Sequence, residues 1–186
     1  MRSYNPSVLK NDLCLEDLYT RAAPHGMLLE RNYAGICMRA ADSVEKGDED
    51  NWSIQNRDFG KDKPLYIRIQ AKNNASTEIN SRVMRLYLTE KKYAGFPAKW
   101  VKMKTIKQGE TASFGTIKSG ANGFTKECFI VNIPSQGTFY LVAQITDAND
   151  KINAAPDSEE SVALESLRRS PQWCVLDVDR SFYISG

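Results

Sequence analysis

Hydrophobic and polar residues alternate along several short segments of the chain. Apolar side chains occupy every second position in residues 65–71, 84–88, 129–133 and 139–145. A period of two is that of a β-strand with one buried face. The polar, turn-rich stretches between these segments are too long for tight hairpins in places, as at 72–81. The pattern therefore predicts strands joined by loops.

The segment TFYLVAQITD, residues 138–147, carries the clearest strand pattern. Phe139, Leu141, Ala143 and Ile145 share one face, and the other face is partly apolar as well. A strand of this kind is typical of the centre of a sheet that is covered on both sides. We expect Leu141 to face the opposite sheet and to pack against the strands YIRI (66–69) and WCVL (173–176).

Short predicted strands recur about every dozen residues, with Gly, Pro and Asn between them. This spacing favours an all-β, immunoglobulin-like antiparallel sandwich over an α/β sheet. We place the sandwich at residues 62–186, with its strands ending by about 182, and expect residues 1–61 to form an extended lead-in that packs on it. A short helix is predicted at 162–169, and a last strand at 173–179.

Several segments resemble a known class of bacterial domain in their order along the chain. YIRIQAKNN (66–74), MRLYLTE (84–90), and NIPSQGTFYLVAQITD (132–147) are similar to the V-R-V-x-N, R-L-Y and P-x-x-G-x-Y-x-L-x-A strands of CARDB-like adhesion domains. The resemblance covers about residues 65–180. It implies an immunoglobulin-like β-sandwich and, by analogy only, a component of a bacterial toxin, injection or phage-related assembly.

Length and composition are those of one ordinary globular domain. The chain has 186 residues, of which 41% are hydrophobic and 26% are charged. The motifs GxGxxG, GxxxxGK[ST] and HExxH do not occur, which removes the commonest nucleotide-binding and zinc-protease interpretations. The sequence has no apolar run of signal-peptide or membrane-spanning length. We therefore predict a cytoplasmic protein, or one exported by a route without a Sec signal.

Charge is distributed unevenly, although the net charge is only +2. Eight basic residues stand against Glu90 alone in residues 82–107, namely Arg82, Arg85, Lys91, Lys92, Lys99, Lys102, Lys104 and Lys107. Six acids stand against Lys151 alone in residues 147–165, namely Asp147, Asp150, Asp157, Glu159, Glu160 and Glu165. Complementary patches of this kind favour docking to a protein partner or self-association.

The four cysteines lack the close spacing of zinc and redox motifs. They are Cys14, Cys37, Cys128 and Cys174. We interpret them as reduced thiols that are mostly packed in the core. The alternative is a bridge between Cys128 and Cys174 in an exported protein.

Candidate catalytic residues are few. The single histidine, His25, lies between Pro24 and Gly26 with no nucleophile motif beside it, so we interpret it as a turn residue. Asp177 and Asp179 stand two apart on the predicted last strand and would share a face. A hydrolase that uses this pair, or an acid from the 147–160 loop, is the enzymatic alternative.

The acidic loop also contains oxygen ligands of the kind that calcium accepts. Asp147, Asn149, Asp150 and Asp157 are the candidates, but the loop lacks the DxDxDG spacing of a calcium-binding loop. We therefore predict a solvated acidic loop, with no metal and no cofactor.

A basic patch is the remaining candidate site. Arg85, Lys99, Lys102 and Lys104 are its members, and aromatic residues stand between them along the chain. Lysines beside rings can bind a nucleic acid or another polyanion. Lysines also protect the edge strand of a sheet without binding any ligand.

Taken together, these features favour a non-enzymatic binding or assembly module that acts on a protein partner. The chain has the pattern of a stable scaffold and no convergent catalytic set. Hydrolysis by surface carboxylates and the binding of a nucleic acid or polysaccharide remain as alternatives.

Overall fold

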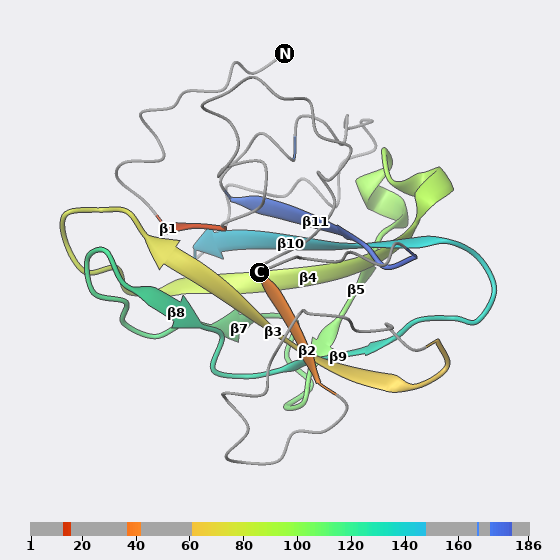
Figure 1. The fold of residues 1–186 in the computed structure, drawn as a ribbon, viewed down its shortest axis with the longest axis horizontal. Helices are drawn as coiled ribbons and strands as arrows, with labels where there is room; N and C mark the ends of the chain where they lie inside the picture. The colour runs from red at the N-terminus through yellow and green to blue at the C-terminus, as the bar shows by residue number, and fades with distance from the viewer. Residues whose placement is uncertain (1–12, 16–36, 42–60, 148–166, 168–171, 180–186) are drawn as a thin grey trace, which may run out of the picture.

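The fold is all-β and consists of two antiparallel sheets (Figure 1). The computed structural model describes residues 13–15, 37–41, 61–147, 167 and 172–179. Every strand pair within them is antiparallel. The alternation of apolar and polar residues predicted this class of fold correctly.

The first sheet has six strands around a central strand, β3. Its strands are β1 (Leu13–Cys14), β2 (Met38–Ala41), β3 (Pro64–Asn73), β6 (Lys104–Thr105), β8 (Asn122–Phe124) and β9 (Phe129–Asn132). β3 pairs with β1 and β2 along one side and with β8 and β9 along the other, and β6 pairs with β9. Side chains of β3 alternate between buried and partly exposed along its length, as the sequence predicted.

The second sheet has five strands, and β4 and β10 form its centre. Its strands are β4 (Arg82–Glu90), β5 (Val101–Lys102), β7 (Ala112–Ser113), β10 (Phe139–Asp147) and β11 (Trp173–Asp177). The order is β11-β10-β4-β5, and β7 pairs with the start of β4. β4 and β10 pair along nine residues each, from Glu90 opposite Phe139 to Arg82 opposite Asp147.

The main hydrophobic core contains the apolar residues of both sheets. Leu141 of β10 is fully buried in this cluster, together with Ile67 of β3 and Leu176 of β11. Leu141 also lies opposite Leu88 and Leu176 in the strand register. The expected inward orientation of Leu141 is therefore confirmed.

A second apolar cluster covers the other face of the second sheet. It consists of Tyr87, Trp100, Val142, Leu167 and Val175, with Tyr140 and Trp173 packed against it. The ring of Trp100 lies 5.7 Å from that of Tyr87 and 6.1 Å from that of Trp173, between ring centroids. β10 thus buries both of its faces, as its sequence pattern predicted.

The chain passes from one sheet to the other between β5 and β6. Lys102 pairs with Tyr87 in the second sheet, whereas Lys104 pairs with Ile130 in the first. Between them, the backbone N–H of Met103 donates to the carbonyl of Leu86 at 2.8 Å. The segment after Trp100 therefore forms two short strands, one in each sheet.

Two 3₁₀ turns precede β5, and the strand pattern did not predict them. These are η4 (Lys91–Tyr93) and η5 (Pro97–Lys99). They project beyond the end of β4 at the right of Figure 1. β8 was also not predicted, because its three residues, NGF, have no alternation to detect.

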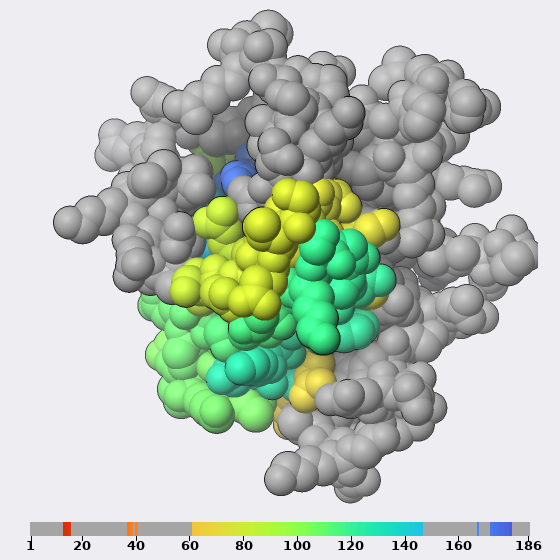
Figure 2. All heavy atoms as spheres, turned by 90° about the vertical axis from the view of Figure 1, so that its left-hand side faces the viewer, coloured from red at the N-terminus to blue at the C-terminus, as the bar shows by residue number. Residues whose placement is uncertain are grey.

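A buried asparagine closes the end of the first sheet where β3 enters its loop. The Asn73 amide donates to the carbonyls of Thr77 and Ile117 at 2.8 and 2.9 Å, and its oxygen accepts from the N–H of Ala75. An isolated bridge joins Ile79 to Ile117. These contacts hold the β3–β4 loop beside the segment that leads into β8, and the two lie side by side in Figure 2.

The ends of the chain are described only in part. β1 and β2 come from the first sixty residues and pair with β3, but the boundary predicted between a lead-in and the sandwich stays a prediction. Of the expected helix at 162–169, only Leu167 is described, in helical conformation. The last strand ends at Asp177, two residues earlier than expected, because Val178 and Asp179 form a turn.

All four cysteines are buried, and none of them forms a disulfide. The bridge considered between Cys128 and Cys174 is therefore wrong. Cys174 lies in the main core on β11, and the Arg68 guanidinium donates to the Cys128 sulfur at 3.4 Å. The thiols are packing residues, as the absence of close spacing predicted.

Truncation of Leu141 tests the register of β10. Leu141→Ala removes buried methyl groups and leaves a cavity, so we expect a loss of about 2 to 5 kcal/mol in the free energy of unfolding. Lys102→Ala, at an exposed position, should change it by no more than about 0.5 kcal/mol. Urea unfolding of both variants measures the difference, and equal midpoints would show that the assigned register is wrong.

Candidate functional site

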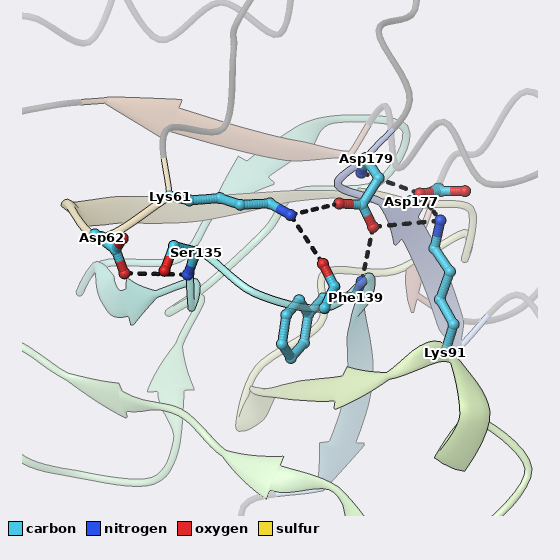
Figure 3. A network of polar contacts seen from close by, with 8 residues as sticks. Lys61, Asp62, Lys91, Ser135, Phe139, Asp177 and Asp179 are labelled. Atoms are coloured by element: carbon cyan, nitrogen blue, oxygen red, sulfur yellow. Dashed lines mark hydrogen bonds and ion pairs between the residues drawn. The ribbon is translucent and has the colours of Figure 1, made fainter.

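Four charged residues meet at one end of the sandwich (Figure 3). Lys61 precedes β3, Lys91 begins η4 directly after β4, Asp177 ends β11, and Asp179 follows it in the turn. These positions belong to both sheets. We name this group the charged cluster.

Short ion pairs connect its members. Lys91 Nζ lies 2.6 Å from Asp177 Oδ1 and 3.3 Å from Asp179 Oδ2. Lys61 Nζ lies 3.0 Å from Asp179 Oδ1. The Asp177 side chain is only 2% exposed. A carboxylate buried to this extent needs a close cation, because its loss of hydration is otherwise uncompensated.

Backbone groups complete the hydrogen bonding of the charged cluster. The N–H of Phe139 donates to Asp179 Oδ2 at 2.8 Å, and the N–H of Asp179 donates to Asp177 Oδ1 at 3.0 Å. Lys61 Nζ donates to the carbonyl of Gly137 at 2.9 Å. The cluster therefore joins the turn before β10 to the end of β11 and to the segment before β3, as Figure 3 shows.

The pKa shifts follow from these contacts. Burial alone would lower the pKa of Lys91, but its hydrogen bonds to Asp177 and Asp179 and their negative charges outweigh burial and raise that pKa. Burial alone would raise the pKa of Asp179. The hydrogen bond from the Phe139 N–H, together with Lys61 and Lys91, outweighs this and lowers the pKa of Asp179.

This arrangement favours a structural role for the two carboxylates. Asp177 and Asp179 converge on one lysine, but Asp179 lies beyond β11 and not on the same strand face, which corrects the expectation from the sequence. A carboxyl group that acts as general acid needs a raised pKa, whereas the pKa of Asp179 is lowered. Hydrolysis by this pair stays a prediction that this geometry does not favour.

The predicted basic patch is divided between different parts of the structure. Arg85 is partly buried on β4, in register with the buried Gln144 of β10. Lys99 and Lys102 are exposed near the 3₁₀ turns, and Lys104 is exposed on β6 of the first sheet. An uninterrupted β5 would place Lys104 opposite Arg85, but the chain leaves the second sheet before that point.

Exposed apolar and basic side chains follow one another along the 3₁₀ turns and β5. We name as the edge surface the exposed side chains of Lys92, Tyr93, Phe96, Lys99, Val101 and Lys102. Two of its lysines lie near carboxylates, Lys92 at 2.7 Å from Glu90 and Lys102 at 3.7 Å from Glu110. The two other aromatic residues of this stretch, Tyr87 and Trp100, lie in the second apolar cluster and are not available to a ligand.

Other candidates from the sequence lie mostly outside the described residues. His25 is among them, and so are Asn149, Asp150 and Asp157 of the predicted acidic loop. Within the part of the chain that the structure describes, no group of three His, Cys, Asp or Glu side chains could hold a metal ion. Nor is any helix there both long and apolar enough to cross a membrane.

No protein-family model matches the sequence, and no curated protein matches it either. The two antiparallel sheets are compatible with the resemblance to CARDB-like domains, but the family stays a prediction.

Sequence reasoning identified half of the charged cluster and missed the rest. Asp177 and Asp179 stood out as acids spaced for a shared face, but Lys91 was counted only among the basic residues of its segment. No pattern in the sequence indicated that Lys61 would belong to the charged cluster. The only sequence pattern that could have indicated the ion pair between Lys91 and Asp177 is a lysine directly after one buried strand and an aspartate at the end of another.

Removal of the Lys91 ammonium group tests the ion pair with Asp177. Lys91→Met removes the ammonium group that lies 2.6 Å from the buried carboxylate of Asp177, and we expect a loss of about 3 to 5 kcal/mol in the free energy of unfolding. The neighbouring Lys92 provides a matched control, because it is paired with Glu90 on the surface. Lys92→Met should leave the urea midpoint near that of the wild type. Equal effects of the two changes would contradict the assignment.

The charged cluster should also make stability depend on pH at both extremes. The lowered pKa of Asp179 means that its contribution is present above the unfolded value of about 3.9 and is lost as pH falls through the folded pKa. The raised pKa of Lys91 means that its contribution is present below about 10.4 and is lost as pH rises through the folded pKa.

Urea unfolding of the wild type and of Asp179→Asn across the acid range measures the first effect. We expect the variant to lose stability less steeply than the wild type as the pH falls. Lys91→Met should in the same way flatten the alkaline side. Parallel pH profiles for wild type and variants would show that other groups cause the dependence.

Proposed function

We propose that this protein is a non-enzymatic binding or assembly module that acts on a protein partner through the edge surface. The observation that carries the proposal is the concentration of exposed apolar side chains there. Five large hydrophobic residues are exposed among the described residues, and three of them, Tyr93, Phe96 and Val101, belong to this surface. Exposed apolar groups bordered by polar ones are typical of protein interaction sites.

The type of residue supports a protein partner. Aromatic side chains are enriched in protein interfaces, because they bury a large area with few rotatable bonds. Lysines around them supply charge complementarity at the rim, where it speeds encounter and selects the partner. The dipolar distribution of charge along the sequence agrees with such a role.

The finer architecture belongs to the same proposal. We infer an immunoglobulin-like, CARDB-like sandwich from the order of its motif-bearing strands, β3, β4 and β10. A place in a bacterial toxin, injection or phage-related assembly rests on analogy with that class. A cytoplasmic location, or export by a route without a Sec signal, is proposed on the same terms.

Two alternatives predict different measurements. A polyanion binder that uses Lys99, Lys102 and Lys104 should bind heparin or single-stranded DNA with an affinity that falls steeply with salt. A hydrolase that uses Asp177, Asp179 or an acid of the 147–160 loop should lose turnover on carboxylate substitution. Of these, polyanion binding agrees better with the exposed lysines and rings of the edge surface.

Cross-linking of the tagged chain in its native cells, followed by mass spectrometry, tests the proposal. We expect a reproducible protein partner, either a second copy or another protein, whose capture falls when Phe96 is changed to Ser. Phe124→Ser is the matched control, because Phe124 is equally an exposed aromatic residue but lies on β8. A chain that captures no partner, or captures one equally well after both changes, would contradict the proposal.

A further inference from the structure

β5 is the terminal strand on one side of the second sheet. Its residues Val101 and Lys102 are both exposed. They pair with β4 on one side, and no strand of the described residues pairs with the other side. An edge strand of this kind can pair through its backbone with an extended segment of another protein.

The register shows which backbone groups of β5 point outward. The N–H of Met103 donates to the carbonyl of Leu86, the residue opposite it when the β4–β5 register is continued by one residue. Residues directly opposite each other in an antiparallel pair alternate between hydrogen-bonded and non-bonded pairs. Lys102 and Tyr87 therefore form a non-bonded pair, and the N–H and carbonyl of Lys102 point away from β4.

The pairing of β4 with β10 agrees with this assignment. The N–H of Lys91 donates to the carbonyl of Thr138, which lies opposite it one residue beyond the paired strands. The same alternation makes Tyr87 and Val142 a bonded pair, so the backbone groups of Tyr87 point to β10 and not to β5. Among the residues that the structure describes, none bonds to the outward N–H and carbonyl of Lys102.

The two side chains of β5 lie on opposite faces of the second sheet, because each shares a face with the residue opposite it. Val101 is opposite Leu88, which belongs to the main core. Lys102 is opposite Tyr87, which belongs to the second apolar cluster. Val101 is 58% exposed, whereas Leu88 is 7% exposed. The apolar face of the sheet is therefore open at Val101, and an apolar side chain on an added strand would cover it.

The charge along this edge favours an acidic ligand. Lys99, Lys102 and Lys104 are exposed. Lys102 Nζ lies 3.7 Å from a carboxylate oxygen of the exposed Glu110. In the described part of the chain, no carboxylate forms an ion pair with Lys99 or Lys104. A carboxylate opposite Lys102 on an added strand would make a favourable cross-strand pair.

We propose that β5 binds an extended, acidic segment of the protein partner as an additional strand of the second sheet. The segment carries an apolar residue opposite Val101 and, next to it in sequence, an acidic residue opposite Lys102. Its backbone bonds to the outward N–H and carbonyl of Lys102. This inference rests on the proposed function, and it names the mode of binding and the chemistry of the partner.

Nuclear magnetic resonance of the full chain tests the inference with a defined probe, a short capped peptide of alternating valine and glutamate. We expect the Lys102 amide to shift strongly on titration and to become protected from hydrogen exchange, because it donates to the added strand. A peptide of alternating valine and lysine is the charge control. It should bind at least about tenfold more weakly, since its charges repel those of the edge.

Two variants at one position separate the backbone contact from the side-chain contact. Lys102→Ala removes the charge and keeps the N–H, whereas Lys102→Pro removes both. Proline is tolerated on an edge strand where the N–H faces outward, and urea midpoints check that each variant is folded. Because one hydrogen bond is lost, we expect Lys102→Pro to bind the acidic peptide about three- to tenfold more weakly than Lys102→Ala. Hydrogen exchange of the wild-type amide decides the matter if proline lowers the stability.

A wild type that binds neither peptide at millimolar concentration, or both equally, would overturn the inference. An unprotected Lys102 amide would also overturn it, since that result indicates contact through side chains alone. A short oligothymidylate that binds the same amides more tightly than the acidic peptide would indicate a polyanion site instead. If Phe96→Ser reduces capture of the cross-linked partner but Lys102→Pro does not, this inference fails while the proposed function stands. If no partner is captured at all, both fail.

Discussion

The pairing of β4 with β10 is the interaction on which the other features of this structure depend. It runs along nine residues of each strand, from Glu90 opposite Phe139 to Arg82 opposite Asp147. Side chains alternate between the two faces, so a slip of one residue would exchange them. Here each face covers a separate apolar cluster. A slipped register would therefore disrupt both apolar clusters together. Burial of apolar side chains on both faces thus selects the observed register.

The same register places the charged cluster. Phe139 lies opposite Glu90, so the start of β10 lies beside the end of β4, where Lys91 follows. β11 runs antiparallel to β10 and brings Asp177 to this end of the sheet, opposite Tyr140. Strand order and register alone therefore bring the ammonium group of Lys91 beside the buried carboxylate of Asp177. The ion pair closes the end of the sandwich because the strand order has already brought its partners together.

The charged cluster and the edge surface use different residues in this protein. The charged cluster engages Asp177 and Asp179 in contacts within the fold, which favours a structural role over catalysis. The edge surface presents rings and lysines outward, on a backbone that Trp100 anchors from beneath. Substitution of its exposed side chains should therefore have little effect on the stability of the core.

The sequence alone determined the class of fold and the longest strands. β3, β4 and β10 were predictable because a period of two is a local property that each strand carries in its own residues. The burial of both faces of β10 was predictable for the same reason, from Val142 beside Leu141. Even the packing role of the cysteines followed from their spacing.

Only the tertiary structure decided where the chain changes sheets and which charges meet. Lys102 and Lys104 look equivalent in sequence, but they pair in different sheets, because the strand leaves β4 at Met103. Asp177 and Asp179 were visible as two acids, whereas Lys61 and Lys91 became their partners through strand order. Contacts between residues far apart in the chain depend on the packing of whole strands, and no local pattern in the sequence predicts them.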